Sequence, residues 1–327
     1  MRSRFSLACC ALFALLLSAC GSGDAPPASW HPYTSQGAYS AALSPDSRFA
    51  ITGSIRHGGS LWDTRNHERL YDWNHQPGDY TSIVASAFSP EGRFAATASN
   101  QDLVLWKLDD GQPVWFWSAP AEILALQLAP AGDFALLGLG NHQAVYFDIK
   151  NGGLRQTLQH PARVRSVALS ADARLALTGA DDYRARLWDL GSGELLQTLE
   201  FANSLDTVAL SPDGERAFSA ATLDQAHIWD TATGRILHTL SGNERLLKRR
   251  ISYLSARFSD DGQQLLTGTA SGMVQLWNVA TGTELRRWRV HKRAIYGPTS
   301  TGVLAVSFGR AGNYYAIGSN GVLNILR

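Results

Sequence analysis

A pattern of about forty residues recurs along the chain, and a sustained repeat of that length constrains the fold more than any other feature. Its first marker is an alternating apolar run that closes on a turn rich in Ser, Pro, Asp and Gly. The copies lie at residues 41–46, 87–92, 127–132, 168–172, 209–214, 257–262 and 306–312. Proline fixes φ at the first corner of a turn, aspartate can bond nearby backbone, and glycine accepts positive φ. Each copy therefore predicts a hairpin between two antiparallel strands.

The second marker follows each of these hairpins, after another apolar strand. In six units it reads Leu61-Trp62-Asp63, Leu105-Trp106-Lys107, Tyr146-Phe147-Asp148, Leu187-Trp188-Asp189, Ile228-Trp229-Asp230 and Leu276-Trp277-Asn278. The seventh unit has only Leu323-Asn324-Ile325-Leu326 in its place. Short strands at regular spacing, each bounded by turn residues, indicate an all-β fold.

The two markers resemble those of the WD-repeat (WD40) β-propeller family, and the resemblance covers residues 30–327. It implies a seven-bladed β-propeller of four-stranded antiparallel blades, with strands lettered a at the central channel to d at the outside. In this family the outer strand d opens the next sequence unit. The last unit here stops after its third strand, so we expect the N-terminal segment 30–36 to pair with the last blade. That closure would protect two sheet edges.

The N-terminal residues differ from the repeats and predict export. Residues 1–19 have a basic opening and an apolar run too short for a bilayer span, as in a signal peptide. Leu17-Ser18-Ala19-Cys20 resembles the lipobox of bacterial lipoproteins, which implies a lipid on Cys20. Residues 20–29 then form a flexible tether. An ordinary signal cut after Ala19 and an uncut anchor helix are the alternatives.

Cysteine count and charge narrow the function further. Cys9 and Cys10 leave with the signal and Cys20 carries the lipid, so no thiol remains for a disulfide, a metal or a nucleophile. The 29 basic residues fall to 27 without Arg2 and Arg4, against 28 acidic residues, a balance that argues against nucleic acid as the partner. Gly21 follows the lipidated cysteine, and by resemblance this favours the outer membrane, facing the periplasm.

The family commonly carries a hydrogen-bonded row of Asp, His, Ser or Thr, and Trp in each blade. Only the fourth unit looks complete, with His160, Thr178, Asp182 and Trp188. The same residue types could form a hydrolase triad, but Thr178 has no evident oxyanion partner. The resemblance implies a structural network instead.

Nothing in the expected inner strands suggests an enzyme. Apolar and small residues dominate them, and the chain has no His pair with zinc spacing, no phosphate loop and no serine elbow. We therefore expect no catalytic residues, no cofactor and no metal. A ring could still bring some of the nine scattered histidines together, so a metal site stays open as an alternative.

Two long basic loops should lie on the face where the d–a loops converge. The candidate partner-binding residues on this face are Arg163, Arg165, Arg245, Lys248, Arg249, Arg250, His291, Lys292 and Arg293. A local positive field would suit an acidic protein segment or an anionic envelope polymer. The alternative is that these side chains only solvate their loops and pair with acids such as Glu244.

These observations favour a monomeric, membrane-anchored interaction scaffold that binds another envelope protein, because WD-repeat proteins usually act as scaffolds. A second hypothesis is an enzyme or ligand-binding propeller that works at the channel mouth. A third is an accessory factor in outer-membrane protein assembly, which rests on architecture alone.

Overall fold

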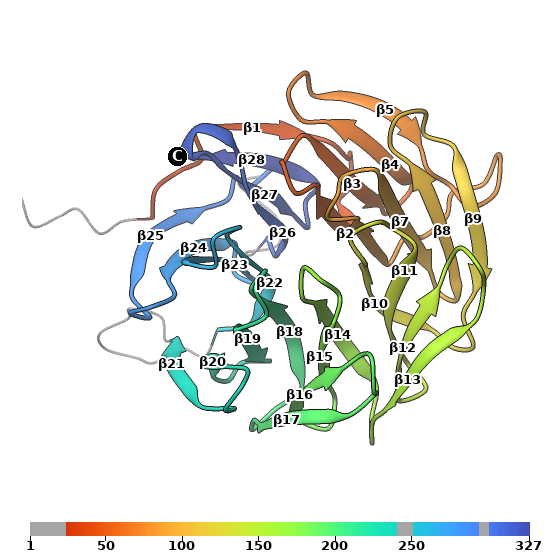
Figure 1. The fold of residues 1–327 in the computed structure, drawn as a ribbon. Helices are drawn as coiled ribbons and strands as arrows, with labels where there is room; N and C mark the ends of the chain where they lie inside the picture. Colours follow the sequence, from red (N-terminus) through yellow and green to blue (C-terminus); the bar gives the residue numbers. More distant parts are fainter. Residues whose placement is uncertain (1–23, 241–250, 294–300) are drawn as a thin grey trace, which may run out of the picture.

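The computed structural model describes residues 24–240, 251–293 and 301–327. In this part of the chain, seven four-stranded antiparallel sheets stand side by side in a ring (Figure 1). The expected all-β, seven-bladed propeller is confirmed. We number the blades 1 to 7 in the order of their inner strands. None of the described helices is long and apolar enough to cross a membrane.

The strands of each blade run in sequence from the channel outward. The inner strands a are β2 (Ala38–Leu43), β6 (Ala85–Phe88), β10 (Ile123–Leu128), β14 (Val164–Leu169), β18 (Leu205–Leu210), β22 (Tyr253–Phe258) and β26 (Val303–Phe308). The strands b are β3 (Phe49–Ser54), β7 (Phe94–Ser99), β11 (Phe134–Leu139), β15 (Leu175–Ala180), β19 (Arg216–Ala221), β23 (Gln264–Thr269) and β27 (Tyr314–Gly318).

The strands c are β4 (Gly58–Asp63), β8 (Asp102–Lys107), β12 (Gln143–Asp148), β16 (Arg184–Asp189), β20 (Ala226–Asp230), β24 (Met273–Asn278) and β28 (Val322–Leu326). The outer strands d are β5 (Glu68–Asp72), β9 (Pro113–Ser118), β13 (Leu154–Gln159), β17 (Leu195–Glu200), β21 (Ile236–Leu240), β25 (Glu284–Arg289) and, for blade 7, β1 (Ser29–Pro32). A short 3-10 helix, η1 (Arg310–Gly312), forms the a–b turn of blade 7.

Side chains of the repeat markers hold the turns. In blade 1, the Ser44 hydroxyl donates to the Asp46 carboxylate at 2.8 Å, and the same carboxylate accepts the backbone N–H of Arg48. The Trp-Asp marker works in the same way at the c–d turn, where Asp189 accepts the N–H of Ser192 at 2.8 Å. These local hydrogen bonds explain why the marker positions favour Ser and Asp.

The N-terminal strand closes the ring. β1 pairs antiparallel with β28, with Trp30 opposite Asn324, and so supplies the outer strand of blade 7 (Figure 1). The predicted closure is confirmed, although the strand starts at Ser29 and ends at Pro32. The segment before it continues onto blade 6, where Ala25 bridges Trp288. The N-terminal segment therefore ties two blades together.

The hydrophobic core is divided among the interfaces between blades. Seven buried clusters each combine residues from two neighbouring blades, so each pair of neighbours has its own core. Close packing requires small residues on strand b. A Cβ on Gly138 would lie 2.6 Å from the Val164 carbonyl oxygen of the next blade. Hydrogen bonds also join adjacent inner strands, as from Ser255 Oγ to the Val303 carbonyl at 2.9 Å.

Candidate functional site

Three of the four row residues in blade 4 are joined by hydrogen bonds through one hydroxyl. The Nε2 atom of His160 lies 2.8 Å from Thr178 Oγ1, and the Trp188 indole N–H donates to the same oxygen at 3.0 Å. The other ring nitrogen of His160 lies 3.0 Å from the Leu158 carbonyl oxygen. All three side chains are buried. Burial lowers the pKa of His160 to about 4, so the ring is neutral near pH 7.

Asp182 lies near this row but bonds elsewhere. Its carboxylate accepts two hydrogen bonds from the Arg186 guanidinium, at 3.1 and 2.5 Å, and both side chains are almost fully buried. Arg186 follows Asp182 across the b–c turn on strand β16, so the pair forms locally. The place that an aspartate would take beside His160 is filled by the Leu158 carbonyl. This row therefore holds the blade through neutral groups and has no histidine–carboxylate pair for catalysis.

Blade 2 holds a second row that the sequence analysis missed. His75 Nε2 lies 3.0 Å from Thr97 Oγ1, which also accepts the Trp106 indole N–H at 2.8 Å. Ser99 Oγ lies 3.1 Å from the other ring nitrogen of His75. The d–a loop before blade 2 is longer than the one before blade 4. His75 is therefore further from its inner strand in sequence than His160 is, and the spacing seen in the fourth unit did not identify it. A histidine just after an outer strand, followed by a Thr on strand b, was the available signal.

The remaining blades keep less of the row. Trp62, Trp229 and Trp277 each donate the indole N–H to a Ser or Thr hydroxyl, at 2.9 to 3.3 Å. In blade 3 the tryptophan position is Phe147, which stacks on Trp117 with ring centroids 3.6 Å apart. The hydrogen bonds of Trp62, Trp229 and Trp277 join strands within a blade, whereas the Phe147–Trp117 stack joins blade 3 to blade 2.

The described members of the predicted basic set have different surroundings. Arg163 is exposed, whereas Arg165 pairs with Asp181 at 2.5 Å, and this hydrogen bond raises the pKa of Arg165. His291 stacks on Trp30 with centroids 3.7 Å apart. Arg293 donates to the Ser35 carbonyl at 2.6 Å, and Lys292 also has a partner.

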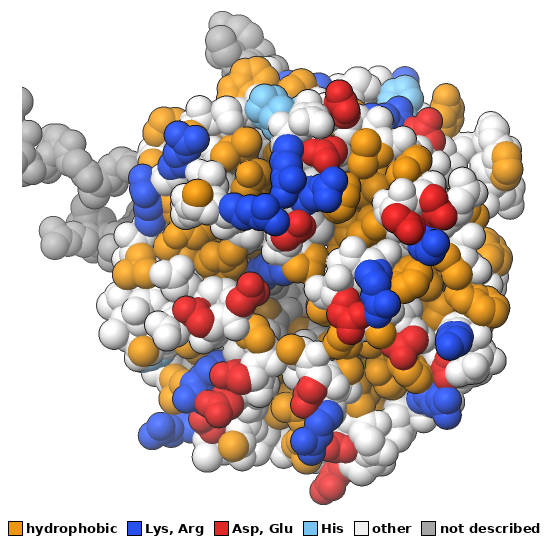
Figure 2. All heavy atoms as spheres, turned by 45° about the horizontal axis from the view of Figure 1, so that its top comes forward, with side chains coloured by type: hydrophobic (Ala, Val, Ile, Leu, Met, Phe, Trp, Pro, Cys, Tyr) orange, Lys and Arg blue, Asp and Glu red, His pale blue; other side chains and the backbone are white. Residues whose placement is uncertain are grey.

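Arg245, Lys248, Arg249 and Arg250 lie outside the described residues, as do Cys20 and residues 1–19. Over the surface seen in Figure 2, Lys and Arg side chains alternate with Asp and Glu around the central opening. The described side chains on that view therefore form no continuous basic surface.

Exposed apolar side chains lie on two parts of the described surface. One is the set of outer strands, with Val114, Trp115 and Phe116 side by side in sequence on β9, and the other is the face formed by the d–a loops and b–c turns, which we call the loop face. Tyr39, Val84 and Leu254 stand at equivalent positions at the start of the inner strands of blades 1, 2 and 6. Tyr80, on the d–a loop before blade 2, is 66% exposed, and Tyr39 is 53% exposed. The b–c turns contribute exposed side chains as well, namely Ile55, Tyr183 and Leu223.

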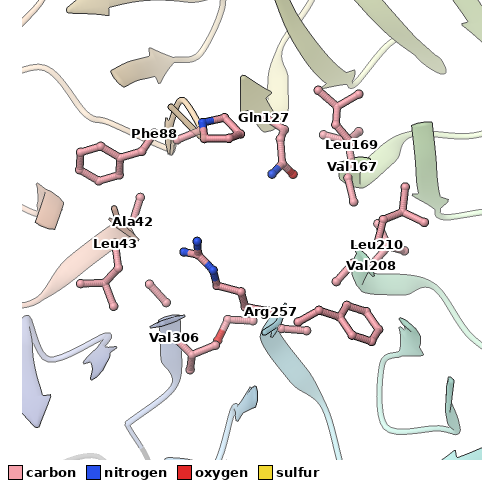
Figure 3. Close-up of a pocket in the computed structure, with 18 of the residues that line it drawn as sticks. Ala42, Leu43, Phe88, Gln127, Val167, Leu169, Val208, Leu210, Arg257 and Val306 are labelled. Carbon is pink, nitrogen blue, oxygen red and sulfur yellow. The ribbon is translucent and has the colours of Figure 1, made fainter. Parts of the chain in front are cut away.

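The central channel contains a cavity of about 630 Å³ that is lined by all seven inner strands. Its lining continues to the turns that follow these strands, including Pro45, Pro90 and Pro212, so it reaches the face opposite the loop face. Most lining side chains are apolar or small, as predicted for the inner strands (Figure 3). Arg257 and Gln127 are exceptions that point into the cavity (Figure 3).

Comparison with known proteins agrees with the geometry. The family model described as WD domain, G-beta repeat matches residues 152–189 and 234–278. Together, the match and the seven blades support a WD40 propeller. No curated protein is similar enough in sequence to count as a match.

The two matched segments show how repeats and blades are offset in this propeller. Residues 152–189 run from the outer strand β13 of blade 3 to strand β16 of blade 4. Residues 234–278 cover β21 of blade 5 and then β22 to β24 of blade 6 in the same order. Because each repeat starts with the outer strand of the preceding blade, every repeat links two blades, and the first outer strand must pair with the last blade.

Within residues 24–240, 251–293 and 301–327, no three His, Cys, Asp or Glu side chains are grouped closely enough to hold a metal ion. The described surfaces that present apolar side chains are the loop face, the outer strands and the channel cavity. The WD40 propeller fold is typical of protein-interaction scaffolds.

Proposed function

We propose that this WD40 propeller is a non-enzymatic interaction scaffold of the bacterial cell envelope. In this proposal a lipid on Cys20 fixes the protein to a membrane, most simply the outer membrane on its periplasmic side. The loop face binds another envelope protein. The lipobox-like residues 17–20 and the short tether that follows support the anchor. The WD40 fold supports the scaffold, because such propellers usually bind proteins.

One observation carries the binding proposal, namely the exposed aromatic side chains of the loop face. Tyr39, Tyr80 and Tyr183 are each about half exposed or more. Tyrosine is enriched at protein interfaces, because it offers a large apolar area and a hydroxyl at a low entropic cost. In this proposal the exposed aromatic side chains of the loop face form the apolar centre of such an interface. The basic residues predicted on the same face would then form its charged rim.

A pair of matched variants tests this use of the loop face. Tyr39→Ser combined with Tyr80→Ser removes two exposed aromatic rings without disturbing a buried group. Leu154→Ser combined with Leu196→Ser removes two exposed apolar side chains from outer strands instead. We expect the partner that crosslinks to the wild-type protein in intact envelopes to be lost from the first variant and retained by the second. Equal recovery of that partner from both variants would refute binding through this face.

The anchor is tested separately with Cys20→Ser, with Cys10→Ser as the control. If Cys20 carries the lipid, mass spectrometry of the wild-type protein and of the control will show an acylated N-terminus. Both proteins will partition into detergent. The Cys20→Ser protein will lack the acyl mass. Acylation or detergent partition that persists in Cys20→Ser would disprove this anchor and leave the scaffold proposal intact.

A further inference from the structure

The inner strand of blade 6 places a cation in the middle of the propeller. Arg257 extends from β22 into the cavity, and Gln127 points toward the same space from β10 (Figure 3). The inner-strand register identifies the equivalent residues in blades 1, 2, 4, 5 and 7, which are Ala42, Ala87, Ala168, Ala209 and Ser307. Among the seven inner strands, all of which the structure describes, Arg257 is therefore the one charged side chain at this position.

The Arg257 guanidinium has little to bond with. Its single hydrogen bond within the described residues goes to Ser307 Oγ, at 3.3 Å, although a guanidinium has five N–H donors. No described carboxylate lies within ion-pair distance, and Asp46 and Asp260 act on it only through longer-range electrostatics. Burial lowers the pKa of Arg257, but an arginine remains charged. Arg257 is only partly buried because it projects into the open channel, and an anion that entered the channel would find its N–H donors largely unused.

The rest of the cavity is lined by side chains that would contact the apolar part of a small-molecule ligand. Val167, Val208 and Val306 line its wall, and the volume of about 630 Å³ falls within the range of small-molecule sites. Gln127 makes no side-chain hydrogen bond in the part of the chain that the structure describes, so its amide is available to a ligand. One cation, one amide and apolar walls match a molecule with a single carboxylate on an apolar body.

We propose that the channel of this WD40 propeller binds a small organic monocarboxylate, with its carboxylate on the Arg257 guanidinium and its apolar body against the channel wall. A guanidinium offers a carboxylate two parallel N–H donors, which is a strong and directional pairing. The Gln127 amide would donate to the same carboxylate or to a polar group on the body. The cavity reaches from the a–b turns to Leu254 at the loop face, but Arg257 and Gln127 are not among the exposed side chains of the proposed partner surface.

Titration calorimetry with acetate, hexanoate and benzoate tests the proposal, with hexanamide as a neutral match for hexanoate and inorganic phosphate as a second anion. The wild-type protein should bind hexanoate or benzoate more tightly than acetate, and hexanamide at least about tenfold more weakly, because charge-assisted hydrogen bonds to a guanidinium are strong. Arg257→Gln should weaken the carboxylates by at least about tenfold. Arg174→Gln, which removes an exposed positive charge from an a–b turn, should leave binding unchanged.

Three results would overturn the proposal. They are no binding of any carboxylate by the wild-type protein, equal binding of hexanamide, and phosphate binding as tight as that of the carboxylates. Unchanged binding by folded Arg257→Gln would also overturn it. If that variant does not fold, the Nε–Hε NMR signal of Arg257 in the wild-type protein decides. Saturable movement with hexanoate supports the site, and a stationary signal refutes it.

Discussion

Burial keeps the His160 ring neutral, and its two partners then decide which ring nitrogen carries the proton. The Leu158 carbonyl can only accept, so the facing Nδ1 atom must carry the proton and Nε2 must be bare. Thr178 then donates its hydroxyl proton to Nε2 while its oxygen accepts the Trp188 indole N–H. One hydroxyl thus satisfies two buried groups from different strands and loops. The row is a structural link whose strength depends on that oxygen atom.

Thr178→Val tests this link, because valine keeps the shape and removes the hydroxyl. Trp188 and His160 would each keep a buried polar atom without a partner, so we expect a loss of roughly 2 to 4 kcal/mol in unfolding free energy. Urea titration measures it. Thr178→Ser retains the hydroxyl and should lose clearly less. If both variants have the same stability, the hydroxyl does not hold the blade.

Asp182 permits a second test at the residue scale. Removing it with Asp182→Ala leaves the buried Arg186 charge unpaired, and we expect a loss of roughly 3 to 5 kcal/mol. Adding Arg186→Met removes the orphaned charge and should recover most of that loss, because buried pairs replaced by apolar residues are often neutral. Urea unfolding of the two proteins measures the difference. A double variant as unstable as the single one would mean that Asp182 acts through another group.

At the scale of elements, the N-terminal strand contributes more than one edge pairing. β1 covers β28, Trp30 stacks on His291, and His31 stacks on His67 of blade 1 with centroids 3.3 Å apart. The ring is thus closed by a strand with contacts on three blades, since Ala25 also bridges Trp288 of blade 6. Because this short segment makes the closing contacts, it can be deleted from the chain or added back as a separate peptide.

Deleting residues 24–32 together with 1–23 should lower the melting temperature by several degrees and promote self-association. The reason is that the edge of β28 becomes free to pair with another chain. The reference protein lacks only residues 1–23. Scanning fluorimetry and light scattering measure both effects, and a synthetic peptide of residues 24–34 should restore the melting temperature where a scrambled peptide does not. A truncated protein that melts like the reference would show that β1 does not hold the ring closed.

At the scale of the whole molecule, buried histidines make the propeller sensitive to acid. The pKa of both His75 and His160 is lowered to about 4, mainly by burial, and burial also lowers the pKa of His67 and His227. The unfolded chain takes up protons near pH 6.5, while the folded chain does not until about pH 4. Stability is therefore full above pH 6.5 and falls as the pH drops toward 4.

The two rows should account for much of this pH dependence. Each of His75 and His160 can contribute up to roughly 3 kcal/mol between pH 7 and pH 4. We expect the urea midpoint of the wild-type protein to fall steadily over that range. In a double variant with His75→Gln and His160→Gln, the urea midpoint should depend less steeply on pH over this range, even if the variant is less stable at pH 7. An unchanged slope would assign the acid sensitivity to other groups.

The sequence alone determined the repeat count, the four-stranded blades and the N-terminal closure. It could do so because alternation and turn residues act locally, as in the Ser44 and Asp46 turn, and because a unit that lacks one strand must find it elsewhere. Tertiary structure decided which groups meet. Asp182 pairs with Arg186, His75 reaches Thr97 across a long loop, and Arg257 shares the channel with Gln127. These choices depend on how separate blades face one another around a ring, and no spacing along the chain records that geometry.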